Sequence, residues 1–215
     1  MKRYLICVCL LAFTFWALRP GLVSAQALQA VEIVTGLVKD LGVPALLEKV
    51  FDKLLKDRTP KEAARPKVRE LYASLLEVRS QRESLLQAIQ QRIKVLRDPK
   101  ADPDSRALSR DDLINRAAEA KTAFLRLKDA FGNLSVDIDS SNPELSNAFG
   151  SFMTRQEAVY VTKVINVDKV SDLDVARIHL EENRSNLENA LKQFRVLTQK
   201  VYPDFGELLS PGVFR

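Results

Sequence analysis

The residues best suited to chemistry are few in this 215-residue chain. Its two cysteines, Cys7 and Cys9, stand two residues apart in the apolar stretch LICVCLL, and its one histidine is His179. The cysteine spacing could suit a redox pair, a metal site or a lipid anchor. A lipid anchor is disfavoured because Cys7 comes very early and lacks a small residue directly before it. Whether the two cysteines could form a redox pair or a metal site depends on the role of the surrounding segment.

The segment around the cysteines resembles an export signal in its layout. A basic pair opens the chain, an apolar run follows over 4–18, and short residues occupy the positions before Gln26. The run is shorter than the ~20 residues that a membrane-spanning helix needs. We therefore predict that residues 1–25 are a secretory signal peptide cleaved after Ala25, and that the protein is exported to the periplasm or the extracellular space. An uncleaved membrane anchor is the alternative.

Cleavage would change what chemistry the chain can offer. It would remove both cysteines and three of the 33 basic residues but no acidic residue, leaving 30 basic against 28 acidic residues. A cysteine-free chain has no disulfide, no thiolate nucleophile and no thiolate metal ligand. A nearly balanced charge also argues against nucleic-acid binding, which depends on neutralising phosphates.

The other polar residues do not form a recognisable catalytic or metal pattern. A di-metal site in a helical bundle places Glu three residues before His, and that position before His179 is Ala176. The paired acids at 102/104 and 137/139 lack the glycine and terminal glutamate of a calcium loop. We therefore expect no catalytic, cofactor-binding or metal-binding residues, a surface position for His179, and a protein that is not an enzyme.

Apolar residues at helical spacing indicate a helical protein. The run over 172–201 keeps a heptad-like apolar seam, as in a coiled coil. The segment 159–165 is rich in residues that favour strands, but no partner strand is visible in the sequence, so a helix is preferred there. The expected helices span 27–41, 44–57, 66–97, 110–131, 143–166 and 172–201.

Capping residues suggest where these helices begin and end. Ser109 and Ser171 each precede an acidic residue by three positions, as in a capping box, and an apolar residue stands directly before each. Gly132 is a good helix stop. Pro66 should end or kink the turn that begins at Thr59. Expected staples join Leu108 to Leu113 and Val170 to Val175, and a further start is expected at Ser141.

Three polar residues fall on apolar seams. Asn183 lies on the seam of 172–201, and Arg82 and Arg92 lie on the seam of 66–97. A buried polar seam residue can fix helix register or oligomeric state, which makes Asn183 a candidate register-setting residue; it can also mark a partly wet seam. Asn183 begins a glycosylation sequon, so a sugar is the competing interpretation, and Asn133 begins a second sequon.

These features predict an all-α protein. We expect an elongated up-and-down bundle of about four long helices with an additional N-terminal amphipathic helix pair. Residues 26–215 would form a single domain, made of the pair over 26–57, the bundle over 58–201 and an irregular tail over 202–215.

The N-terminal pair is the best candidate for action on a partner. It is hinged at Gly42-Val43-Pro44, and its second member carries an apolar face that could enter a partner's groove or lie on a membrane. The alternative is that this helix packs on its own bundle. The candidate partner or membrane face consists of Leu47, Val50, Phe51 and Leu54.

The sequence therefore predicts an exported, non-enzymatic helical bundle that works by binding another protein or a second copy of itself. Adaptor, inhibitor, immunity and chaperone-like roles all fit this prediction. The alternative is a lipid- or membrane-interacting bundle that uses the amphipathic segment 27–57.

Overall fold

The computed structural model describes residues 30–32, 43–56, 61–139, 147–151 and 164–204. Residues 1–30 and 31–215 form separate units, and the account below concerns the second. The proposed signal peptide with its cysteines, the helix starts expected at Thr59 and Ser141, and the tail beyond residue 204 lie outside the described residues.

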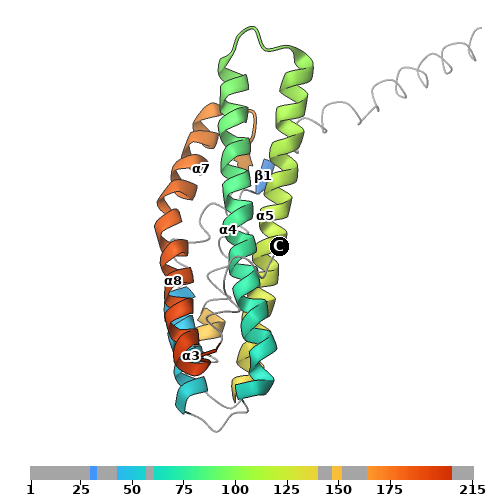
Figure 1. The fold of residues 1–215 in the computed structure, drawn as a ribbon. Coiled ribbons are helices and arrows are strands. Elements are labelled where there is room, and N and C mark those ends of the chain that lie inside the picture. Colours follow the sequence, from blue (N-terminus) through green and yellow to red (C-terminus); the bar gives the residue numbers. More distant parts are fainter. Residues whose placement is uncertain (1–29, 33–42, 57–60, 140–146, 152–163, 205–215) are drawn as a thin grey trace, which may run out of the picture. The chain divides into compact units, whose positions relative to one another are not determined.

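Helices dominate the described residues, which confirms the all-helical prediction (Figure 1). Two of the helices are long, with 37 residues each. Two three-residue strands pair with each other. In chain order the elements are β1 (Ala30–Glu32), α3 (Val43–Lys56), α4 (Lys61–Arg97), α5 (Pro103–Asp139), β2 (Val164–Asn166), α7 (Val170–Glu182) and α8 (Arg184–Val201).

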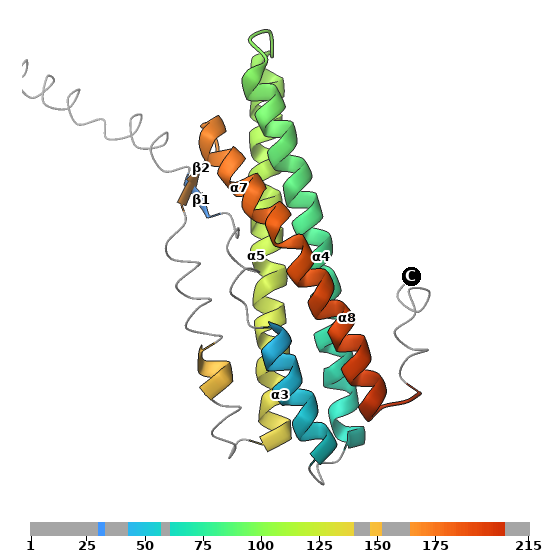
Figure 2. The same ribbon diagram turned by 90° about the vertical axis from the view of Figure 1, so that its left-hand side faces the viewer.

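The long helices α4 and α5 form an antiparallel hairpin, and the shorter helices pack along it. Helix α8 and helix α3 lie beside the half of the hairpin that holds the start of α4, whereas α7 lies beside the half near the turn (Figure 1). Figure 2 shows α3 between α5 and α8. Consecutive helices joined by a short turn commonly pack antiparallel in this way.

The apolar residues of these helices form two core clusters. The first joins α3, α4, α5 and α8, and its centre is aromatic: Phe194 stacks on Tyr72 at 5.1 Å between ring centroids and meets Phe51 edge-on at 5.3 Å. The second joins α4, α5, α7 and Ile165 of β2. Of the described elements, only α4 and α5 contribute residues to both clusters.

Helix α5 is longer at both ends than the 110–131 predicted. It begins at Pro103, where the Asp102 carboxylate accepts the Ser105 N–H at 2.8 Å and the Ser105 hydroxyl at 2.7 Å. These hydrogen bonds lower the pKa of the Asp102 carboxyl. Asp102 therefore caps the start of α5.

The capping box expected at Ser109 and the stop expected at Gly132 are both wrong. Ser109 is buried inside α5 and donates its hydroxyl to the Arg106 carbonyl at 3.1 Å. Leu108 is 70% exposed and so forms no staple. The helix passes through Gly132 because its apolar face, including Phe131 and Leu134, continues to pack in the core.

Helix α4 begins at Lys61, five residues before the 66–97 predicted, and it contains Pro66. The helix continues through Pro66, so the expectation that this residue ends the turn begun at Thr59 is wrong. A proline so near the helix start removes one N–H bond to the Glu62 carbonyl. Burial of Ala64 and Val68 on either side of it compensates for that loss.

Two of the ranges expected to be helical contain a strand. The range 27–41 includes β1, and the range 143–166 ends in β2. The two strands pair with each other. Because they lie far apart along the chain, neither segment has a partner strand near it in the sequence. Residues 147–151 are helical, as expected for the start of the second range.

The single helix expected over 172–201 is present as two helices that meet at Asn183. The backbone stays helical there, with φ −78° and ψ −12°, and the Asn183 N–H donates to the His179 carbonyl at 3.1 Å. Helix α7 begins at Val170 without a side-chain cap. The cap expected at Ser171 and its staple are wrong, and Val175 is 53% exposed.

Helix α3 confirms the helix expected over 44–57, and its first turn holds Pro44, a residue favoured at that position. The structure corrects the use proposed for its apolar face. Packing against α8 and α5 buries the whole candidate partner or membrane face, and the exposed fraction is 0% at Leu47, Val50, Phe51 and Leu54.

Candidate functional site

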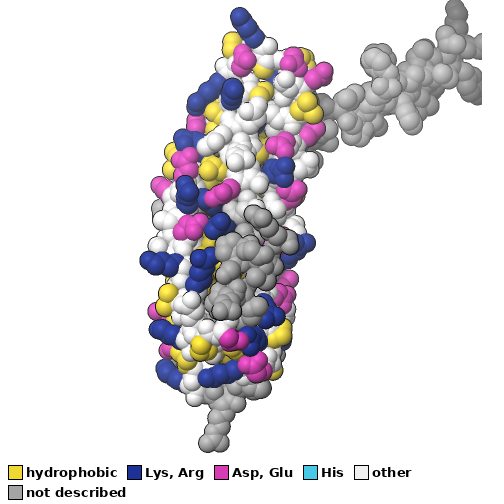
Figure 3. Space-filling model, in the orientation of Figure 1, with side chains coloured by type: hydrophobic (Ala, Val, Ile, Leu, Met, Phe, Trp, Pro, Cys, Tyr) yellow, Lys and Arg dark blue, Asp and Glu magenta, His cyan; other side chains and the backbone are white. Residues whose placement is uncertain are grey.

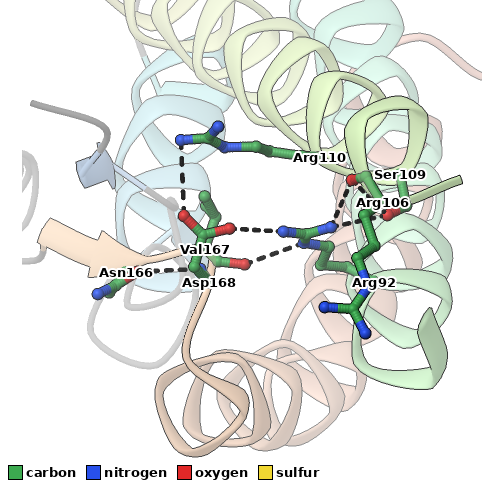
Figure 4. Close-up of polar contacts among 7 residues, drawn as sticks. All are labelled: Arg92, Arg106, Ser109, Arg110, Asn166, Val167 and Asp168. Carbon is green, nitrogen blue, oxygen red and sulfur yellow. Dashed lines mark hydrogen bonds and ion pairs between the residues drawn. The ribbon is translucent and has the colours of Figure 1, made fainter. Parts of the chain in front are cut away.

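Arg92 of α4 is the centre of a largely buried polar cluster. Its side chain is 4% exposed, and its guanidinium bonds to groups on two other parts of the chain (Figure 4). Nε donates to the Val167 carbonyl at 3.1 Å, and Nη1 donates to the Arg106 carbonyl at 2.6 Å and the Ser109 hydroxyl at 2.9 Å. Nη2 pairs with Asp168 at 2.5 Å.

This arrangement makes Arg92 a structural tie. It joins α4 to α5 and to the connection between β2 and α7, and Arg110 of α5 adds a 3.5 Å ion pair to Asp168 (Figure 4). The flat guanidinium matches several acceptors at once, which a lysine could not do. Since its donors are used within the fold, we assign it to stability and not to ligand binding.

Arg82, ten residues earlier on α4, is buried in a different setting. It is 5% exposed, and its Nη1 donates to the Leu180 carbonyl at 2.7 Å. In an unbroken helix that carbonyl would accept the Arg184 N–H. Arg82 therefore replaces the missing backbone donor at the junction of α7 and α8. This hydrogen bond explains how the helix can be interrupted there while its apolar seam continues.

A groove lies beside Arg82, between α4 and the junction of α7 with α8. Its volume is about 520 Å³, and it is open to solvent along one side. Leu86 is its apolar lining residue and is half-buried against the second core cluster. Its polar lining consists of Arg82, Glu83, Gln87, Gln90, Glu181 and Arg184.

The groove's charges are unequally compensated. Glu181 is held by Arg177 at 2.9 Å. Arg82 has one ion-pair partner among the described residues, Glu83, at 3.4 Å from Nη2. Glu188 is near enough for its charge also to favour the charged form of Arg82, and the Arg82 Nε is buried without a hydrogen-bond partner in that part of the chain. Arg184 is exposed and makes no ion pair within the part of the chain that the structure describes. The uncompensated charge of the groove is therefore positive.

Burial weakens the charged form of Arg82. Desolvation lowers the pKa of its guanidinium, Arg184 adds to that shift, and Glu83 opposes it. An arginine remains protonated despite such a shift. Desolvation is the largest cause of the shift, so this charge has lost part of its contact with water.

The face seen in Figure 3 carries no large patch of one charge. Basic and acidic side chains alternate along it, with isolated apolar residues between them. On α7 the exposed apolar residues are Val175 at 53% and Ile178 at 44%. Single exposed apolar residues are common on protein surfaces, so they do not mark a site by themselves.

The sequence located some of these residues but not their arrangement. Asn183 is 1% exposed, as expected of a seam residue, and a glycan there is incompatible with its burial. Asn133, the other sequon residue, is exposed on α5. His179 is part-exposed on α7, with Nδ1 3.7 Å from Glu182, as predicted for a surface histidine.

The lining of the groove was not identified from the sequence. Arg82 stood out as a cation on an apolar seam, and that signal could have indicated a buried guanidinium. Gln87 and Gln90 carry no such signal, because polar residues on the outer face of a long helix are ordinary.

No group of three or more His, Cys, Asp or Glu side chains is placed to hold a metal ion in the described ranges. Among the described helices, none carries an apolar stretch long enough to cross a bilayer.

Comparison of the chain with protein-family models, with curated proteins and with solved structures found no match.

Proposed function

We propose that this protein is an exported, non-enzymatic bundle of about four long helices that acts by binding another protein. The observation that supports this proposal is the open groove between α4 and the α7–α8 junction. It combines an apolar residue, two amide side chains and charges of both signs. Such a lining suits a peptide segment or a helix of a partner, because it offers hydrogen bonds and charge together with apolar contact.

The support around the groove also favours binding. Its α4 side belongs to a long helix that runs through both core clusters, and its other side is tied to α4 by Arg82. Outside the groove, Arg97 pairs with Asp174 at 2.7 Å and Arg79 with Glu188 at 3.8 Å. A site built on rigid elements loses little conformational entropy when it binds.

Site-specific photo-crosslinking in the producing cell tests this proposal. A photoreactive residue at Gln90, in the groove, should crosslink to one discrete protein that mass spectrometry can identify. The matched control is the same residue at Leu125, which is 40% exposed on α5. Equal crosslinking from both positions, or none from either, would contradict binding through the groove. Turnover of a substrate that His179→Ala abolishes would contradict the non-enzymatic assignment.

The alternative, in which the protein binds a membrane through α3, requires this helix to leave the core. Helix α3 would have to withdraw four fully buried apolar side chains, each contributing roughly 1.5–3 kcal/mol by its burial. Their sum is comparable to the whole stability of a typical domain. Flotation with anionic or neutral vesicles tests this alternative. Flotation together with rapid hydrogen exchange in α3 would support it over protein binding.

A further inference from the structure

We propose that the groove between α4 and the α7–α8 junction binds a carboxylate of a protein segment, held between Arg82 and Arg184. This inference deepens the proposed function and rests on it, since it names the chemistry that the groove recognises.

The first argument is the state of Arg82. Its side chain is 5% exposed. One of its two terminal nitrogens, Nη1, donates a hydrogen bond to the Leu180 carbonyl. The other, Nη2, has only the half-exposed Glu83 at 3.4 Å, a long contact for a charged pair. A buried cation with weak compensation gains more from an incoming anion than a solvated one does.

The second argument is the position of Arg184. It lines the same groove, it is close enough for its charge to disfavour the charged form of Arg82, and it has no ion pair within the described ranges. Glu83 and Glu188 offset part of the Arg82 charge, but neither makes an ion pair with Arg184 within the described ranges, so an incoming anion could compensate Arg184 and the rest of the Arg82 charge. Glu181 does not fill this role, because Arg177 holds both of its oxygens, at 2.9 and 3.1 Å.

The other residues that line the groove restrict the class of ligand that it can bind. Leu86 offers an apolar contact beside the two arginines, and the amides of Gln87 and Gln90 can bond to a peptide backbone. A carboxylate next to a leucine-sized side chain fits this combination better than an isolated small anion does. The expected ligand is therefore an acidic residue, or a terminal carboxylate, in an apolar context.

The test is an NMR titration of the purified chain with arginine Nε–H groups labelled. The probes are the capped tripeptide acetyl-Leu-Glu-Leu-amide, its Leu-Gln-Leu counterpart, and acetyl-Leu-Leu with a free terminal carboxylate. The Glu peptide should shift the Arg82 and Arg184 signals saturably, and the Gln peptide should not. The signal of Arg92, which is buried and bonded to Val167, is an internal reference and should stay in place.

Substitutions complete the test. Arg184→Gln should weaken binding of the Glu peptide roughly tenfold, the loss expected for one charged hydrogen-bond partner. The matched control is Lys192→Gln, which removes the same charge from an exposed position on α8 outside the groove and should change binding less than about twofold. The free-carboxylate peptide shows whether a side-chain or a terminal carboxylate is preferred.

Two results would overturn the inference. One is the absence of saturable shifts with either carboxylate peptide at tens of millimolar. The other is equal binding of the Glu and Gln peptides. If crosslinking from Gln90 still identifies a partner, such a result removes the carboxylate chemistry and leaves the proposed function standing.

Discussion

At the scale of single residues, Arg92 shows how one side chain can join distant parts of the chain. It serves two backbone carbonyls as well as Ser109 and Asp168. Replacing it with leucine would leave the buried Val167 carbonyl without its donor and would remove one of the two arginines that pair with Asp168. We expect Arg92→Leu to lower the free energy of unfolding by roughly 2–4 kcal/mol, measured by urea titration.

Arg97→Leu is the matched control for that substitution. It lies on the same helix, is 61% exposed and pairs with Asp174 at 2.7 Å. An exposed ion pair contributes about 0–1 kcal/mol, so this change should be small. Equal effects of the two substitutions would show that the Arg92 cluster is no more important than a surface pair.

Tyr202 predicts a dependence of stability on alkaline pH. It is 2% exposed, and its hydroxyl donates to the Lys61 carbonyl. Burial, assisted by the charge of Glu62, raises its pKa from 10.0 to about 12. Because the folded-state pKa is higher, the protonated hydroxyl stabilises the fold fully below pH 10, and this contribution disappears as the pH rises toward 12.

The variant Tyr202→Phe isolates this effect. It should be about 1 kcal/mol less stable than the wild type at pH 8, because it loses one hydrogen bond. The difference should shrink or reverse between pH 10 and 12, because in this range the wild-type phenol ionises once unfolding exposes it, which stabilises the unfolded wild type but not the unfolded variant. Unfolding curves of both proteins across this range measure it, and a constant difference would contradict the assignment.

The sequence predicted correctly that polar residues on an apolar seam are buried. Asn183 and Arg92 lie on apolar seams, and both are buried. The acceptors of Arg92 could not be predicted, because Val167 and Asp168 are about 75 residues away along the chain and are brought near by the fold alone. The groove beside Arg82 eluded prediction for the same reason.

At the scale of elements, α3 offers a comparison between two consecutive leucines. Leu54 is 0% exposed in the first core cluster, and Leu55 is 38% exposed. Leu54→Ala should cost about 2–5 kcal/mol of unfolding free energy, through lost burial and a cavity. Leu55→Ala should cost less than about 1 kcal/mol. Similar costs, measured by chemical denaturation, would indicate that α3 does not dock as described.

Gly132 lies within α5, so an alanine there should stabilise the helix. A methyl group at this position would meet Phe149 at 3.4 Å, an ordinary contact distance. Gly132→Ala should therefore raise the free energy of unfolding by roughly 0.5–1 kcal/mol. A thermal unfolding scan can detect this change, and a lower melting temperature would show that Phe149 cannot adjust to the added methyl group.

Element boundaries were harder to predict than element type. Ser109 and Gly132 have the right residue types for a helix start and stop, yet the apolar face of α5 continues past both. Packing energy outweighs a local capping preference of about 1 kcal/mol. Strands β1 and β2 were missed because neither has a partner nearby in the sequence, and a two-stranded pairing is decided by the tertiary fold.

At the scale of the whole molecule, export predicts a chain without thiols. Only Cys7 and Cys9 supply sulfhydryl groups, and both precede the expected cleavage site. The mass of the exported protein should match a chain beginning at Gln26, and its melting temperature should be the same with and without a reducing agent. A mass that includes residues 1–25 would favour a retained anchor instead.

The two core clusters have a consequence for how this protein can vary in length. Cluster residues recur along α4 from Ala64 to Ile93 and along α5 from Leu113 to Leu134. Inserting or deleting a single residue in either helix would rotate everything beyond it by about 100°, and would turn an apolar face toward solvent. Evolutionary gain or loss of residues should therefore concentrate in the turn over 98–102, where no such register has to be kept.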